Sequence, residues 1–281
     1  MGHGDLLALA VEVADEAADL VREGRRGGVE VADTKTSPID IVTEVDRASE
    51  RLIFDRLTAA RPGDAFLGEE GGASAGSDGA DGPAVDQVQW VVDPIDGTVN
   101  FLYGIPTYAV SIAAVVAGRS VAGVVHNVHT GERFTATLGG GAFHDGKRLQ
   151  LPAGRPARPM SQLLVGTGFH YQEHVRRGQA AAAALLLMEV RDLRRIGSAA
   201  LDLCAVAAGR YDAYVEEGLH PWDAAAGALV ATEAGALVAR RRGAGGTDCY
   251  VSASAQEFDA FDDLVRRCGF LAPAGSDQPG E

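Results

Sequence analysis

The chain has 281 residues, of which 46% are hydrophobic and 23% are charged, a composition typical of a soluble globular protein with an ample core. Its 39 acidic and 25 basic residues leave a formal net charge of −14. Because an acidic surface repels phosphate backbones and anionic headgroups, we expect neither nucleic acid nor a membrane as a partner.

The N-terminal part of the sequence predicts two amphipathic helices. Apolar residues recur at helical spacing over residues 5–22, and a glycine-rich segment ends this pattern. A second helical pattern follows Thr43, which is a suitable N-cap, and stops before Arg61-Pro62-Gly63.

Short apolar runs after residue 64 predict β-strands. AFLGEE (65–70) and QWVVD (89–93) are apolar and end in acids, as buried strands with functional ends do. The Gly-, Ser- and Asp-rich segment between them, 71–87, predicts a mobile surface loop. Residues 108–118, 120–128 and 132–138 are separated by turn residues and predict consecutive antiparallel strands.

Strand and helix patterns alternate in the second half of the chain, which is typical of layered folds that mix helices with sheets. The predicted helices cover residues 173–189, 198–208, 222–234 and 256–268. Within the first of them, AAAALLLM (181–188) is too short to span a membrane, and we expect its Leu185–Met188 cluster to lie in the core.

The domain organisation predicted from these patterns is one unit over residues 1–281 with two lobes. No internal repeat and no Pro-rich or charged linker separates the halves. We place an N-terminal α+β lobe over about residues 1–150, a C-terminal α/β lobe over about 151–270 and a flexible tail over 271–281.

Cysteine usage and the N-terminus favour a cytoplasmic protein. Cys204, Cys249 and Cys268 are widely spaced and form no CxxC pair, so neither a disulfide framework nor a zinc site is indicated. The N-terminus lacks a basic segment before an apolar stretch, and no run of about 18 apolar residues occurs.

Three acidic motifs lie where predicted elements begin or end: Gly68-Glu69-Glu70, Asp93-Pro94-Ile95-Asp96-Gly97-Thr98 and Trp222-Asp223. In the second motif a buried strand precedes Asp93, and Gly97 permits close backbone approach, so Asp93 and Asp96 can face one point. Carboxylate and carbonyl oxygens are the ligands that Mg²⁺ prefers. An isolated D-x-x-D is more often an Asx turn or a helix N-cap than a metal site.

The combination of motifs, in this order and over nearly the whole chain, resembles the inositol monophosphatase family of magnesium-dependent, lithium-sensitive phosphatases. The matching segments are Lys35-x4-Asp40-x2-Thr43-x2-Asp46, GEE (68–70), DPIDGTVNF (93–101), GGGAF (139–143), IGSAALDLC (196–204) and EEGLHPWDAAAGALVATEAGA (216–236). The resemblance implies an alternating αβαβα sandwich, commonly assembled as a homodimer.

The resemblance also implies a set of metal ligands. Glu69, Asp93 and the carbonyl of Ile95 would bind a first Mg²⁺, and Asp93, Asp96 and Asp223 a second. Glu69 would also serve a weaker third ion, so the expected cofactor is two to three Mg²⁺. Cations a few ångströms apart can hold phosphate oxygens, activate a water and stabilise the leaving oxygen, so no covalent intermediate is needed. Lithium would inhibit by taking the second site, beside Asp223.

Three residues are implied as catalytic by the same resemblance. Thr98 and Glu69 would hold the attacking water, and Asp46 would accept the threonine hydroxyl and so orient it. From the residues alone, Asp46 is also explained as an acid in the first turn of a helix, and Thr98 as a helix cap.

The implied substrate contacts lie on both sides of this centre. The backbone N–H groups of Gly97 and Thr98 would bind phosphate at a helix start. Gly197, Ser198 and Glu216 match positions that hold substrate hydroxyls. Without the resemblance, the Gly-Ser pair is simply a helix start, and Glu216 a solvated acid beside Glu217.

The expected reaction is hydrolysis of a small phosphomonoester, foremost myo-inositol monophosphate, to an alcohol and phosphate. Alternative substrates are histidinol phosphate, fructose 1,6-bisphosphate and adenosine 3′,5′-bisphosphate. An alternative of another class is a non-catalytic regulator on the same fold that binds a protein or RNA. The complete acidic set, Glu69, Asp93, Asp96 and Asp223 together with Thr98, favours the enzyme.

Overall fold

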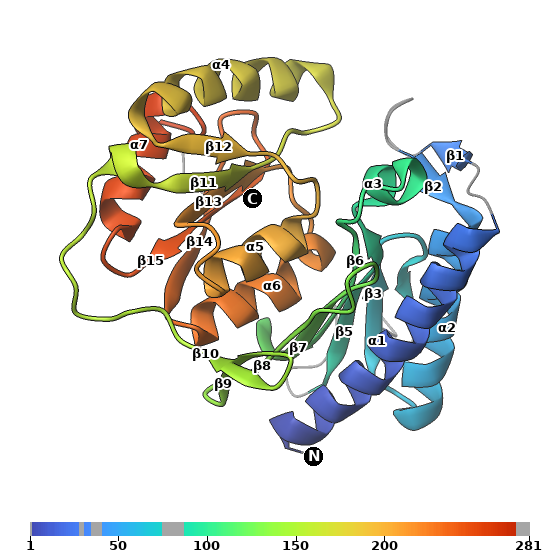
Figure 1. Ribbon diagram of the computed structural model, residues 1–281. Helices are drawn as coiled ribbons and strands as arrows, with labels where there is room; N and C mark the ends of the chain where they lie inside the picture. Colours follow the sequence, from blue (N-terminus) through green and yellow to red (C-terminus); the bar gives the residue numbers. More distant parts are fainter. Residues whose placement is uncertain (1, 28–30, 35–40, 75–86, 274–281) are drawn as a thin grey trace.

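The computed structural model describes residues 2–27, 31–34, 41–74 and 87–273 (Figure 1). Its two large sheets carry most of the strands, and helices cover both faces of each sheet. The helices are α1 (His3–Arg26), α2 (Glu44–Ala60), α3 (Thr98–Tyr103), α4 (Glu173–Glu189), α5 (Ala199–Ala207), α6 (Pro221–Glu233) and α7 (Phe258–Cys268), with a short 3₁₀ turn at Met160–Gln162.

The first sheet has eight strands in the order β10-β9-β8-β7-β6-β5-β3-β4. Only the β3–β5 pair is parallel. The strands are β3 (Ala65–Gly68), β4 (Gly72–Ser74), β5 (Gln89–Asp96), β6 (Ala109–Val116), β7 (Arg119–Asn127), β8 (Arg133–Thr137), β9 (Gly141–His144) and β10 (Lys147–Leu149). The predicted antiparallel meander is therefore present as β6–β7–β8, and β9 and β10 extend it beyond the prediction.

The second sheet has five strands in the order β12-β11-β13-β15-β14. Strands β11, β12 and β13 run parallel, whereas β15 is antiparallel to both of its neighbours. The strands are β11 (Leu164–Thr167), β12 (Asp192–Arg194), β13 (Ala213–Glu217), β14 (Ala236–Arg242) and β15 (Asp248–Ser254). A separate two-stranded ribbon, β1 (Val31–Thr34) with β2 (Ile41–Thr43), was not predicted from the sequence.

Three apolar clusters define five layers, so the predicted αβαβα sandwich is confirmed. The first cluster joins α1 and α2 to the eight-stranded sheet, and the second encloses α5 and α6 between the two sheets. The third packs α4 and α7 against the outer face of the five-stranded sheet. Figure 1 shows this succession from the blue helices to the yellow and red ones.

Local sequence explains why the N-terminal helices form. Along α1, Leu6, Ala10, Val13 and Val21 recur at helical spacing and are buried against the sheet. Helix α2 begins as predicted at Thr43, whose hydroxyl accepts a hydrogen bond from the backbone N–H of Asp46.

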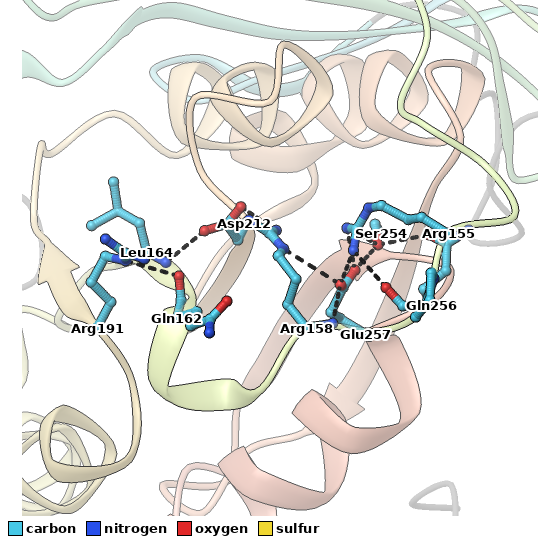
Figure 2. Close-up of polar contacts among 10 residues, drawn as sticks. Arg155, Arg158, Gln162, Leu164, Arg191, Asp212, Ser254, Gln256 and Glu257 are labelled. Atoms are coloured by element: carbon cyan, nitrogen blue, oxygen red, sulfur yellow. Dashed lines mark hydrogen bonds and ion pairs between the residues drawn. The ribbon is translucent and has the colours of Figure 1, made fainter.

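The connection between the two sheets is held by a network of charged side chains (Figure 2). Arg155 donates to both oxygens of Glu257, one of them at 2.8 Å, and Ser254 also donates to that carboxylate. Arg158 pairs with Asp212, which in turn accepts the backbone N–H of Leu164 at 2.7 Å. The segment after β10 is thereby fixed to the start of β11 and to α7.

The predicted burial of the Leu185–Met188 cluster is wrong for three of its four residues. Leu186 is buried, but Leu185 and Leu187 are about half exposed and Met188 is 82% exposed. Helix α4 is an outer layer and buries only one face, so consecutive apolar residues cannot all point inward.

Two further expectations fall partly outside the described residues. The predicted loop 71–87 contains β4 at its start, and residues 75–86 lie outside the described part. Of the predicted tail, Leu271 is buried and pairs with Gly243, and residues 274–281 lie outside the described part. Among the residues described, no helix combines the length and apolar character needed to cross a membrane.

Candidate metal centre and active site

A cleft of about 550 Å³ brings the three acidic motifs together. It lies where the end of β5, the start of α5, the end of β13 and the start of α6 meet. All the predicted site residues line this cleft except Asp46 and Ser198, which lie directly behind it and bond to residues that do.

Three carboxylates converge in the cleft. Asp93, Asp96 and Asp223 each offer an oxygen, and these oxygens all lie within 4.8 Å of one another. Asp93 and Asp96 come from the irregular end of β5, where the register with β6 shifts, and Asp223 comes from the first turn of α6. The donor set is all oxygen, which fits a hard divalent cation.

Hydrogen bonds hold each carboxylate in place. Asp93 accepts the backbone N–H of Ile95 at 3.0 Å, and Asp223 accepts that of His220 at 2.6 Å. Asp96 accepts the hydroxyl of Ser198 at 2.6 Å and the backbone N–H of Ala200 at 2.8 Å. Because Ser198 is also the N-cap of α5, the start of this helix positions the second acid of the motif.

The electrostatics of the cluster call for a cation. Burial raises the pKa of Asp93, and repulsion from Glu69, Asp96 and Asp223 raises it further. The pKa of Asp223 is raised for the same two reasons, burial first and then repulsion from Glu69 and Asp96. Within the described residues, no arginine or lysine forms an ion pair with any of the three clustered aspartates. A divalent ion therefore fits the charge and the ligand chemistry of this cluster.

Thr98 and Asp46 form a hydrogen-bonded pair beside the cluster. The Thr98 hydroxyl lies 3.0 Å from a carboxylate oxygen of Asp46 and 3.1 Å from the carbonyl oxygen of Ile95. Asp46 is fully buried and also accepts the backbone N–H of Thr43 at 2.9 Å. Asp46 therefore caps α2 and also accepts the Thr98 hydroxyl. The sequence offered these two interactions as alternatives, and the structure has both.

Two glycines allow the cleft walls to approach closely. Gly97 has φ +96° and Gly197 has φ +98°, in the left-handed region that favours glycine. A Cβ at Gly97 would lie 3.0 Å from the carbonyl oxygens of Gly197 and Thr107. Side chains at these two positions would narrow the cleft beside Thr98.

Glu216 lies in β13 and lines the cleft. It accepts a hydrogen bond of 2.7 Å from the hydroxyl of Tyr214. Burial raises its pKa, while this hydrogen bond and the positive charge of Arg195 oppose the rise. Glu216 is thus a partly buried acid of the cleft wall with a protein donor.

Sequence reasoning missed several cleft residues. Arg195, Phe169 and Thr247 line the cleft, and so do His170 and His220. Arg195 stands two residues before Gly197, so its proximity to a predicted motif could have identified it. His220 lies within the matching segment 216–236, whereas Phe169, His170 and Thr247 come from segments without a sequence motif.

Fold and site together define a layered protein with a candidate divalent-metal centre in a cleft between its two sheets. Comparison with known proteins identifies the family. The model of the inositol monophosphatase family matches residues 4–263, and the chain belongs to this family. The family is one of metal-dependent phosphatases, as the acidic cluster leads one to expect.

Individual relatives agree with this assignment. The chain is 49% identical over 282 residues to an inositol-1-monophosphatase of Mycobacterium leprae, covering 95% of this chain and 96% of the relative. The structure of Mycobacterium tuberculosis SuhB superposes with a TM-score of 0.79 at 43% identity, covering 96% and 99% of the two chains. A Pasteurella multocida relative, 39% identical over 234 residues and covering 83% and 84% of the two chains, is named Nus factor SuhB.

Proposed function

We propose that the protein hydrolyses a small phosphomonoester, foremost myo-inositol monophosphate, in a Mg²⁺-dependent reaction. The observation that carries this proposal is the convergence of Asp93, Asp96 and Asp223 within 4.8 Å in a cleft without a basic partner for them. The relative named inositol-1-monophosphatase supports the choice of substrate.

The proposed metal ligands are Glu69, Asp93, the Ile95 carbonyl, Asp96 and Asp223, with two to three Mg²⁺ as cofactor. When bound, Mg²⁺ supplies Lewis-acid stabilisation of the phosphate oxygens and of the leaving oxygen. The role of the chain is to keep the five oxygen donors converged by the hydrogen bonds at Asp93, Asp96 and Asp223.

Thr98, Asp46 and Glu69 are proposed to position the attacking water. The Thr98 hydroxyl has one proton and two acceptors, Asp46 and the Ile95 carbonyl, so its lone pairs can accept a hydrogen bond from water. The water oxygen forms a new bond to phosphorus and releases a proton to solvent, while the ester P–O bond breaks and the leaving alkoxide takes a proton from solvent. The backbone N–H groups of Gly97 and Thr98 would bind the phosphate oxygens, and Gly197, Ser198 and Glu216 would contact the alcohol part.

Phosphate release from a substrate panel tests this function. The panel contains inositol 1-phosphate, histidinol phosphate, fructose 1,6-bisphosphate, adenosine 3′,5′-bisphosphate and an aryl phosphate, each with Mg²⁺ and with a chelator. We expect Mg²⁺-dependent release that is fastest with inositol 1-phosphate and is inhibited by lithium. Release without Mg²⁺ would contradict the metal assignment. Faster hydrolysis of a bisphosphate than of inositol 1-phosphate would replace inositol 1-phosphate as the proposed substrate.

The same assay tests the alternative of a non-catalytic regulator, for which the name Nus factor of one relative is the supporting observation. A chain with this role alone would release no phosphate from any member of the panel. We favour the enzyme because Asp93, Asp96 and Asp223 converge although their repulsion has a cost in stability.

We also propose a cytoplasmic homodimer. The exposed apolar residues Leu185, Leu187 and Met188 on α4, together with Tyr103 and Ile105 near α3, are surfaces that a second copy could cover. Analytical ultracentrifugation tests the dimer, and a single monomeric species at micromolar concentration would contradict it.

A further inference from the structure

A short turn between β3 and β4 carries Glu69 to the cleft. Strand β3 ends at Gly68 and β4 begins at Gly72, and the two strands are antiparallel neighbours. Glu69 lines the cleft, and after burial its repulsion is the largest effect that raises the pKa of Asp93, so these two carboxylates lie close together. The position of Glu69 in the cleft therefore depends on the conformation of this turn.

Glu50, in the second turn of α2, holds the turn from behind. Its side chain is buried, with 7% of the residue exposed. One of its carboxylate oxygens accepts the backbone N–H of Glu70 at 2.8 Å. That N–H belongs to the peptide unit that begins at the carbonyl of Glu69, and because a peptide unit is planar, the hydrogen bond restrains the backbone orientation of Glu69.

The same carboxylate explains both glycines of the Gly68-Glu69-Glu70-Gly71 motif. A Cβ at Gly68 would collide with one oxygen of Glu50, and a Cβ at Gly71 would lie 2.6 Å from the other. A side chain at either position would push the carboxylate of Glu50 out of its place. The motif therefore needs glycine at both ends because a buried carboxylate lies against its backbone.

Glu50 is one of three buried polar residues on the same face of α2. Asp46, Ser49 and Glu50 follow one another at spacings of three and four residues, which places them on one side of a helix. The Ser49 hydroxyl donates to the carbonyl of Pro94 at 3.3 Å, and Asp46 bonds to Thr98. One face of α2 thus contacts two of the three acidic motifs and sets them relative to each other.

We propose that Glu50 is a positioning residue of the metal centre, which sets the place of Glu69 relative to Asp93 through the turn between β3 and β4 and thereby raises the affinity for the divalent ion. The inference rests on the proposed function and deepens it. Glu50 is not among the described residues that line the cleft, so it acts through the backbone of the turn and not as a ligand. Groups that hold a metal ligand in place typically contribute about ten- to a hundredfold in metal affinity or activity.

The test measures binding of Mn²⁺, a probe ion that prefers the same oxygen ligands as Mg²⁺, from the EPR signal of the free ion. The Mg²⁺ dependence of phosphate release is measured beside it. In Glu50→Ala the dissociation constant for Mn²⁺ and the Mg²⁺ concentration for half-maximal release should both rise about tenfold or more. Glu50→Gln keeps the length of the side chain and one acceptor oxygen, so its values should lie between those of Glu50→Ala and the wild type.

Two control variants separate positioning from a loss of stability. Asp55→Ala removes an exposed acid from the same helix and should change neither quantity. Glu257→Gln alters a buried acid that also accepts a backbone N–H but is not among the described residues lining the cleft. It should lower the free energy of unfolding, measured with urea in a chelator, and leave the affinity for Mn²⁺ unchanged. If Glu50→Ala does not fold, Glu50→Gln provides the same test with a smaller expected rise.

Unchanged Mn²⁺ affinity in a folded Glu50 variant would overturn the proposal and leave the phosphatase function in place. A loss of affinity no greater than that of Glu257→Gln at equal stability would also overturn it. If the wild type binds Mn²⁺ but releases no phosphate, it is the proposed phosphatase function that fails, and the Mn²⁺ affinity of Glu50→Ala still decides the role of Glu50. A wild type that binds no Mn²⁺ would overturn both.

Discussion

Two groups of buried acids in this protein behave in opposite ways. Glu257 is fully buried, yet its pKa is lowered to about 2, because hydrogen bonds from Arg155, Ser254 and the Arg158 backbone outweigh the effect of burial. Asp93 is equally buried, but burial and the repulsion of neighbouring acids raise its pKa well above the usual range. The two sites differ in where the positive charge that balances the acid comes from.

The comparison separates a structural site from a functional one. At Glu257 the chain supplies its own cation, Arg155, and the acid joins the segment between the sheets to α7 (Figure 2). At Asp93 the charged neighbours are acids, and the cluster fits an outside cation that would balance them. Removing an acid should therefore destabilise the first site and abolish function at the second.

The largest expected effect is that of Asp93→Asn on activity. In the proposed metal centre Asp93 would be a ligand of two cations, and a neutral amide could not replace its carboxylate there, so kcat should fall about a thousandfold or more. The free energy of unfolding without metal should stay the same or rise, because the variant removes one of several repelling charges. Steady-state kinetics and urea unfolding in a chelator measure the two. Near-normal turnover would contradict the bridging role, and clear destabilisation would make Asp93 resemble Glu257.

Thr98→Ala and Asp46→Asn should follow in size. Each removes one side of the 3.0 Å hydrogen bond that orients the hydroxyl, and each should lower kcat about a hundredfold, the typical cost of a misplaced reacting group. Because the two residues act as one unit, the double variant should be little worse than either single variant. Steady-state kinetics of the wild type and the three variants give the double-mutant cycle. Additive losses would mean that Asp46 acts chiefly as the helix cap at Thr43.

Glu257→Gln should lower stability and spare activity. A fully buried carboxylate whose pKa falls from 4.5 to about 2 contributes about 3 kcal/mol to the free energy of unfolding near neutral pH. Urea unfolding measures the loss, and Asp263→Asn, an exposed acid on the same helix, is the control. A loss of turnover as large as that of Asp93→Asn would erase the distinction between the two sites.

The lowered pKa of Glu257 also predicts that its contribution to the free energy of unfolding depends on pH. Because folding depresses the pKa of Glu257, its contribution is complete above about pH 5 and is lost as pH falls toward 2. The difference in unfolding free energy between wild type and Glu257→Gln should therefore shrink across that window. A constant difference from pH 7 to pH 3 would show that Glu257 stabilises by packing rather than by charge.

The smallest effect is expected at Glu216, which combines features of both sites because it has a protein donor, Tyr214, and also faces the cleft. Glu216→Gln should lower kcat/KM for inositol 1-phosphate about tenfold through a lost charged hydrogen bond, and should leave an aryl phosphate unaffected. Equal losses on both substrates would assign Glu216 to the metal centre or the fold. No loss on either would remove it from the substrate site.

The sequence alone determined the order of most elements, the five-layered fold and the acidic motifs that line the cleft. Helical and strand periods are local properties, and α1, α2, the β6–β8 meander and the later helices follow them closely. The acidic motifs at 68–70, 93–98 and 222–223 supported the resemblance to the family whose model matches the chain, because the spacing of motifs can be read from the sequence without a structure.

Only the tertiary structure decided which side chains are paired, buried or free. Leu186 and Met188 have the same local pattern, yet one is buried and the other exposed, because burial depends on what packs against α4. The Arg155–Glu257 pair joins residues about a hundred positions apart, and no local pattern links them. Charge pairing is a property of distance in space, and a linear pattern carries little information about it.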